Sequence, residues 1–224
     1  MSATLYPSAG PFPTVTTLYD YRTKIELQDE FATGLSSSGS IGSLGWATSG
    51  GTNALIAPET NHPGILRRDT GSSINTLTAT FLYGANRQFL GSESYTWLYV
   101  VRLNTNDALT LVRIGMLAAA ANPSVAGMYF EKLDADTNWF CVTRLSSSET
   151  RVDSGVAVTT DFMTFSAMKD ASGATFYING VRVVGPIGIT LPNVCFPVVL
   201  VNNGEAASKT LDIDYFQQQI TVSR

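Results

Sequence analysis

The chain has 224 residues, a length that suits one large β-sandwich better than two small domains, and 44% of its residues are hydrophobic. Only 14% are charged, and the formal net charge is −4 with a pI of about 4.9. This balance excludes a broad basic surface, so no nucleic-acid partner is expected. No stretch reaches the roughly 18 apolar residues of a membrane span, and the first residues lack the apolar stretch of a signal peptide. We therefore expect the protein to be made in the cytoplasm and to leave it, if at all, by a route such as cell lysis.

Residues 1–20 differ in composition from the rest of the chain. Three prolines there break any regular secondary structure, and aromatic residues lie between them. This pattern predicts an extended N-terminal arm in front of a single domain over residues 21–224. We expect the arm to dock on a partner through its prolines and aromatics, which are Tyr6, Pro7, Pro11, Phe12 and Pro13. The alternative is that the arm covers an edge of its own sandwich.

From residue 24 onward, apolar and polar residues alternate with a period of two, which is typical of β-strands. Strands are predicted at residues 24–31, 63–70, 75–82, 95–104, 108–117, 125–133, 138–145, 161–170, 174–184, 196–202 and 209–222. A loop rich in glycine and serine interrupts them at 34–45, and at most one helical turn is expected, at 117–123. The sequence therefore predicts an all-β protein, an antiparallel two-sheet β-sandwich.

Two local patterns refine this prediction. In the strand at 95–104, the odd-numbered residues are apolar and face one way, and apolar residues also occupy the middle of the other face. Both faces of this strand should therefore be covered. Asn179 and Gly180 lie between two β-rich runs and predict a type I′ hairpin turn, because that turn needs positive φ at both positions.

The cysteines, the histidine and the paired arginines are predicted to have structural rather than catalytic roles. Cys141 and Cys195 are the only cysteines, and each lies in an apolar run, so we expect buried free thiols rather than a disulfide. The single histidine, His62, lies in a loop, and nothing in the sequence joins it to either thiol. Arg67 and Arg68 are interpreted as two solvated side chains at a strand end.

Several stretches together resemble a known family. They are KIELQDEFATG, GSIGSLGW, NHPGILRRDTG, GMYFEKLDADTNWFCVTRLSSSETRVDSGVAV, FYINGVRV and TLDIDYF. In this order they resemble bacteriophage virion structural proteins that have a concanavalin A-like (lectin/glucanase) jelly-roll domain. The resemblance implies a jelly-roll fold and a role as a head-decoration, fibre or tail accessory subunit. Residues 1–20 lie outside it.

Carboxylate clusters are the first candidates for a catalytic site. Retaining glucanases on this fold resemble one another in an E-x-D-x-x-E strand, whose outer carboxylates act about 5–5.5 Å apart. The sequence lacks this pattern. Its nearest cluster is Glu26, Asp29 and Glu30, but a strand places Asp29 on the face opposite both glutamates. No catalytic residue is therefore assigned, and a glycosidase or lyase is disfavoured.

Asp134, Asp136 and Asn138 begin like a calcium-binding loop. Trp139 and Leu145 stand where such a loop requires a glycine and a glutamate. We therefore predict a hairpin turn in which the Asp and Asn side chains bond local backbone. No metal and no cofactor is expected.

A sugar-binding face is the remaining candidate site. Asp212 and Asp214 are predicted to share one face of the last strand, with Tyr215 on the other, and Trp97 and Tyr99 could supply an aromatic platform. The competing interpretations are a solvated sheet face for the aspartates and a core position for the aromatics.

Two functional hypotheses follow. The main one is a non-enzymatic structural or accessory protein of a phage particle, displayed on the virion surface and attached largely through the N-terminal arm. Its expected partners are other virion proteins of the capsid or tail and further copies of the same chain. The alternative is a glycan-binding, lectin-like adhesion module that recognises a host cell surface.

Overall fold

A computed structural model describes residues 24–31, 41–82, 94–106, 109–120, 126–189 and 195–221. The predicted arm and its docking residues lie outside this part of the chain, as do most of the loop at 34–45 and the end of the predicted helical turn at 117–123. The described residues form fifteen strands and no helix. Accordingly, they contain no helix long and apolar enough to cross a membrane.

Eight strands build one antiparallel sheet. They are β1 (Lys24–Asp29), β3 (Thr52–Ile56), β4 (Ile65–Asp69), β6 (Ser94–Leu103), β11 (Met163–Asp170), β12 (Gly173–Ile178), β13 (Val181–Ile187) and β15 (Thr210–Thr221). Their order is β13-β12-β11-β6-β15-β4-β3. The long strand β15 pairs with β4 near its start and with β1 near its end, so these two strands share one of its sides.

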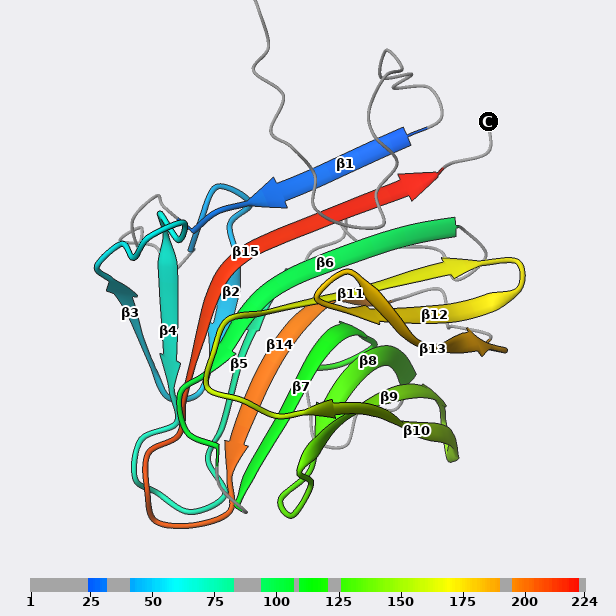
Figure 1. The fold of residues 1–224 in the computed structure, drawn as a ribbon. Coiled ribbons are helices and arrows are strands. Elements are labelled where there is room, and N and C mark those ends of the chain that lie inside the picture. The colour runs from blue at the N-terminus through cyan, green and yellow to red at the C-terminus, as the bar shows by residue number, and fades with distance from the viewer. Residues whose placement is uncertain are drawn as a thin grey trace, which may run out of the picture.

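The other seven strands build the second antiparallel sheet. They are β2 (Ala47–Ser49), β5 (Leu77–Phe81), β7 (Thr110–Leu117), β8 (Ala126–Lys132), β9 (Asn138–Leu145), β10 (Ser148–Ala157) and β14 (Phe196–Asn203). Their order is β10-β9-β8-β7-β14-β5-β2. The two sheets pack face to face (Figure 1), and this confirms the predicted all-β, two-sheet jelly-roll sandwich.

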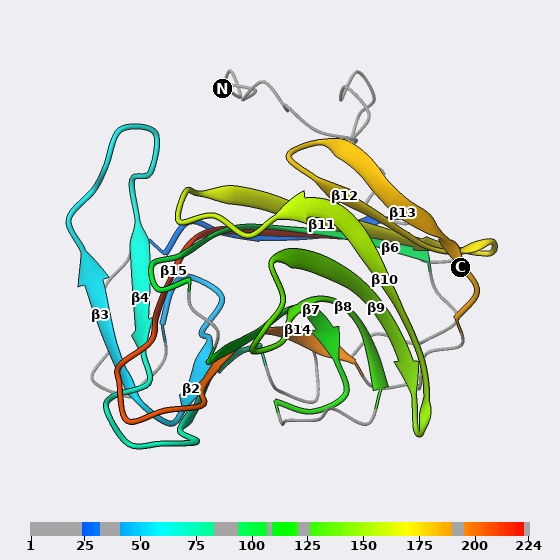
Figure 2. The ribbon, with the colours of Figure 1, turned by 60° about the horizontal axis from the view of Figure 1, so that its bottom comes forward.

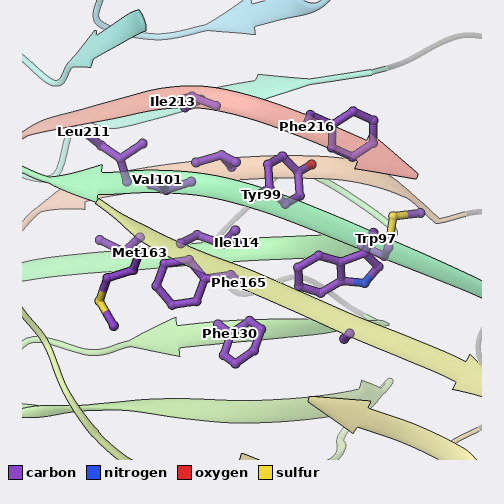
Figure 3. Close-up of a cluster of buried hydrophobic side chains, with 14 of the residues drawn as sticks. Trp97, Tyr99, Val101, Ile114, Phe130, Met163, Phe165, Leu211, Ile213 and Phe216 are labelled. Carbon is purple, nitrogen blue, oxygen red and sulfur yellow. The ribbon is translucent and has the colours of Figure 1, made fainter. Parts of the chain in front are cut away.

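The main core lies between the sheets and is rich in aromatic side chains (Figure 3). Trp97 and Tyr99 of β6 point into it and are 0% exposed, so neither can form part of a ligand face. Their candidate role was therefore wrong, because the alternation of β6 turns its odd-numbered residues toward the opposite sheet. On the outer face of β6, Leu98 is also buried, as predicted.

The seven-stranded sheet arches toward the other sheet, so that its outer face is concave (Figure 2). A second apolar cluster covers the middle of this outer face. Tyr129, Val142, Val198 and Leu200 belong to it and are at most 1% exposed. These four side chains therefore offer no exposed surface to a ligand.

The chain crosses from the seven-stranded sheet to the eight-stranded sheet through two glycines. Gly50 and Gly51, between β2 and β3, have φ values of +64° and +55°. A Cβ atom would lie 2.0 Å from the carbonyl oxygen of Leu77 at Gly50 and 2.0 Å from that of Asp69 at Gly51. Only glycine fits this crossing, because both the backbone conformation and the space exclude a side chain.

Two local predictions are confirmed. Asn179 and Gly180 have φ values of 49° and 77° and close the hairpin between β12 and β13. Cys141 and Cys195 are buried free thiols. Burial raises the pKa of Cys195 to about 12 and raises that of Cys141 further.

Two other sequence interpretations need correction. The strands β3 and β10 were not predicted, because both are mostly exposed edge strands. The arginines at 67 and 68 are not a solvated pair. Arg68 is 1% exposed and donates to backbone carbonyls that include Gly50 O, at 2.8 Å, and burial lowers its pKa to about 10. Arg67 is bound to Asp212.

Candidate functional site

A row of charged side chains crosses the outer face of the eight-stranded sheet. Register places Asp212 of β15 directly between Arg67 of β4 and Arg102 of β6. Arg67 donates from Nε and Nη2 to the two carboxylate oxygens of Asp212, at 2.7 and 2.8 Å. Arg102 donates from Nε and Nη2 to Asp212 Oδ2, at 3.1 and 2.7 Å. One carboxylate therefore holds two guanidinium groups in fixed positions.

Asp212 is the centre of this row and is 0% exposed. Burial alone would raise its pKa, but the hydrogen bonds from Arg67 and Arg102 outweigh burial and hold the pKa of Asp212 below its usual range. The carboxylate is therefore ionised at neutral pH.

Glu59 joins the row from the loop between β3 and β4. Its carboxylate accepts from Nη1 and Nη2 of Arg102, at 2.9 and 2.7 Å, and these bonds lower the pKa of Glu59. The backbone of Glu59 is itself paired with that of His62, by two hydrogen bonds of 3.0 and 2.9 Å. The loop therefore places Glu59 and His62 side by side above the sheet.

A β-bulge turns Asp214 toward His62. In the pairing of β15 with β6, Ile213 faces Val101 and Tyr215 faces Val100, which leaves Asp214 as the extra residue. The bulge shifts the alternation by one residue. Strict alternation had predicted that Tyr215 shares the core face of Ile213. Because of the bulge it does not, and Phe216 takes the core position instead.

His62 and Asp214 form a close pair. Nδ1 of His62 lies 2.8 Å from Oδ2 of Asp214. When the Asp214 carboxylate is ionised it only accepts, so Nδ1–H of His62 is then the donor of this hydrogen bond. Asp214 is 6% exposed, and its Oδ1 atom has no hydrogen-bond partner among the described residues. Burial raises the pKa of Asp214, which the hydrogen bond from His62 only partly offsets.

Phe162, in the connection between β10 and β11, joins both parts of the network. Its ring stacks on the His62 ring with centroids 3.9 Å apart and an interplanar angle of 22°. The guanidinium carbon of Arg102 lies 4.3 Å from the centroid of the same ring. These contacts fix the ring against the charged row and combine aromatic stacking with a cation–π interaction.

These groups border an open depression of about 670 Å³. Its lining residues come from two loops and one strand and are Pro58, Glu59, Thr60, His62, Arg102, Thr160, Asp161 and Phe162. Figure 2 shows the β3–β4 loop extending past the eight-stranded sheet, on the side away from the other sheet. The depression therefore lies on the outside of the sandwich, within reach of a ligand from solvent.

The sequence identified part of this site. Asp212 and Asp214 do lie together, but both are buried and act through Arg102 and His62 rather than as an exposed face. Arg102, Glu59 and the 160–162 segment were missed. The outward position of Arg102 on β6 was available from the alternation of that strand, whereas its neighbours depend on register and loop conformation.

The other carboxylate clusters are structural. Asp29 is buried and accepts from the backbone N–H groups of Phe31 and Leu44 and from Nε1 of Trp46, at 3.0, 2.8 and 3.2 Å. Glu26 instead accepts from Gln217, at 2.6 Å. The two residues lie on opposite faces of β1, as predicted, and share no cleft.

The calcium-like segment is a hairpin turn between β8 and β9, as predicted. Asp136 accepts from the backbone N–H of Leu133, at 2.7 Å. Asn138 does not bond local backbone as predicted, because it donates to the carboxylate of Asp153, at 3.1 Å. In the described ranges, no three His, Cys, Asp or Glu side chains gather as ligands for a metal ion.

No protein-family model and no curated protein matches this sequence. Solved structures match the fold. A protein of unknown function from Shewanella oneidensis MR-1 has a TM-score of 0.65 and 13% identity, over 90% of this chain and 89% of that one. A structure from work on endo-acting O-glycanases of the human gut microbiota has a TM-score of 0.61 and 12% identity, over 88% and 99%. The carbohydrate recognition domain of Emp47p has a TM-score of 0.58 and 11% identity, over 89% and 98%.

These similarities define the class of the fold. The chain is an antiparallel β-sandwich of the lectin-like jelly-roll type. At 11–13% identity the likeness extends to the fold alone. It does not transfer a ligand or a reaction.

Proposed function

We propose that this protein is a carbohydrate-binding domain whose ligand occupies the depression beside Arg102. The observation that carries the proposal is the rigid charged network that borders this open depression on a lectin-like sandwich. Sugars are bound by fixed polar groups that match their hydroxyls, and here Glu59 is held in place by two hydrogen bonds from Arg102. A preorganised site loses less entropy on binding than a mobile one.

The chemistry of the site favours binding over hydrolysis. A general acid for glycosidic cleavage needs a raised pKa and access to the substrate. Glu59 is accessible, but its hydrogen bonds with Arg102 lower its pKa. Asp214 has a raised pKa, but it is buried beneath His62. The proposal is therefore a binding domain without hydrolytic activity, and an assay for released reducing sugar should detect none.

The proposal is tested by screening the full chain against a broad glycan library and then filling the depression. Thr160 is an exposed residue of the lining, so Thr160→Trp should block the depression and weaken the bound glycan at least tenfold. Ala171→Trp is the matched control, because Ala171 is exposed in the turn at the other end of β11. Both variants should keep the wild-type melting temperature. Equal glycan binding by both variants would place the binding surface elsewhere, and no binding by the wild type would refute the proposal.

Display of this domain on a phage particle stays a prediction. This prediction depends on the sequence resemblance alone. The same holds for the predictions that the protein binds other virion proteins and assembles from several copies. The two ideas are compatible, because a glycan-binding domain on a particle surface would contact the host.

A further inference from the structure

The charges around the depression do not balance. Arg67 and Arg102 bring two positive charges, whereas Glu59, Asp161, Asp212 and Asp214 bring four negative ones. These six side chains together carry a net charge of −2. An incoming anion would therefore meet repulsion, although an arginine lines the depression.

The hydrogen-bond donors of the site are also largely used. The Nε and Nη2 groups of both arginines donate to Asp212, and the two Nη groups of Arg102 donate to Glu59. Acceptors remain in excess on the lining, because the carboxylates of Glu59 and Asp161 only accept, whereas the hydroxyls of Thr60 and Thr160 both donate and accept. A ligand that fits this depression must therefore donate more hydrogen bonds than it accepts.

Asp161 is the residue that distinguishes between ligands. It is exposed on the lining, and its carboxylate has no hydrogen-bond partner in the described part of the chain. Glu59, by contrast, is already neutralised by Arg102. Asp161 is thus the carboxylate with its full charge available to a ligand.

We infer that the depression selects glycans without negative charge and prefers those with a free amino group, with Asp161 as the specificity-determining residue. The inference rests on the proposed function and adds the ligand class. An ammonium group about 4 Å from an exposed carboxylate gains roughly fivefold in affinity at low salt. An acidic sugar loses a similar factor, and both effects shrink as salt screens the charges.

The test compares neutral, amino-bearing and acidic glycans of matched size, printed as three groups of one library, at 20 mM and 300 mM NaCl. We expect affinities in the order amino, neutral, acidic, with a smaller spread at high salt. Asp161→Asn should remove the amino preference, so that amino-bearing and neutral glycans bind with equal affinity, and Asp161→Lys should favour acidic glycans. Asp134→Asn is the control, because it removes one exposed negative charge from the turn between β8 and β9.

The outcomes separate the two proposals. Binding that Thr160→Trp blocks, but that is equal or stronger for acidic glycans, would overturn the inference and leave the proposed function standing. An amino preference that Asp134→Asn removes as fully as Asp161→Asn would also overturn it, because the effect would then come from net charge. Absence of any glycan binding would overturn both.

Discussion

Replacing Asp212 by asparagine tests whether the charged row is a rigid part of the fold. The carboxylate is 0% exposed and accepts four hydrogen bonds from Arg67 and Arg102. Removing one partner of a buried ion pair costs about 3–5 kcal/mol. Because the Arg67 side chain is 33% exposed and that of Arg102 is 17% exposed, water recovers part of this loss. We expect Asp212→Asn to lower the free energy of unfolding by about 3 kcal/mol, or the melting temperature by about 6–12 °C.

Urea unfolding at pH 7 and low salt measures this loss. Trp46, Trp97 and Trp139 are at most 2% exposed, so their fluorescence should report the transition. Urea is the suitable denaturant, because guanidinium chloride would screen the ion pairs. Asp134→Asn removes an exposed carboxylate and should stay within about 0.5 kcal/mol of the wild type.

The pH dependence gives an independent check. The pKa of Asp212 is lower in the folded protein than its usual value of 3.8. Its contribution to stability is therefore fully present above that value and is lost as the pH falls through the folded pKa. The difference between wild type and Asp212→Asn should be constant from pH 7 to about 5 and shrink below about pH 4. A loss at pH 7 below about 1 kcal/mol would show that the row behaves as ordinary surface salt bridges and would refute the reasoning.

Three further predictions concern the rest of the chain. Gly51→Ala should lower the free energy of unfolding in urea by about 2–4 kcal/mol, because the new Cβ would lie 2.0 Å from a backbone carbonyl oxygen. Gly45 also has a positive φ but nothing within 4 Å of its Cβ position, so Gly45→Ala should lower it by only about 1 kcal/mol. Native Cys141 and Cys195 should not react with a thiol reagent at pH 8 until urea unfolds the protein, since burial raises the pKa of both thiols; rapid labelling of the native protein would contradict this. Deleting residues 2–18 should leave the melting temperature unchanged and abolish co-sedimentation with virions, and a much lower melting temperature would instead make the arm part of the fold.

The fold was accessible from the sequence because it depends on local pattern. Period-two alternation marked most strands, and Asn179-Gly180 marked a hairpin by its backbone requirement alone. The edge strand β10 escaped because burial on one face creates the alternation, and β10 is mostly exposed. The core position of Trp97 and Tyr99 needed the second sheet, since a strand pattern shows that two residues share a face but not which face is covered.

The site could not be obtained in the same way, because its residues are distant in sequence. Arg67, Arg102 and Asp212 become neighbours only through the register of three strands, and one residue of slip would separate them. The bulge at Asp214 breaks the alternation that the sequence pattern predicts for the last strand. His62 reaches Asp214 through a loop whose path no local rule specifies. The sequence by itself therefore determined the apolar periodicity and the turns. The charged network was decided only by the tertiary structure, because ion pairs and hydrogen bonds form between side chains that folding brings within about 3 Å of each other.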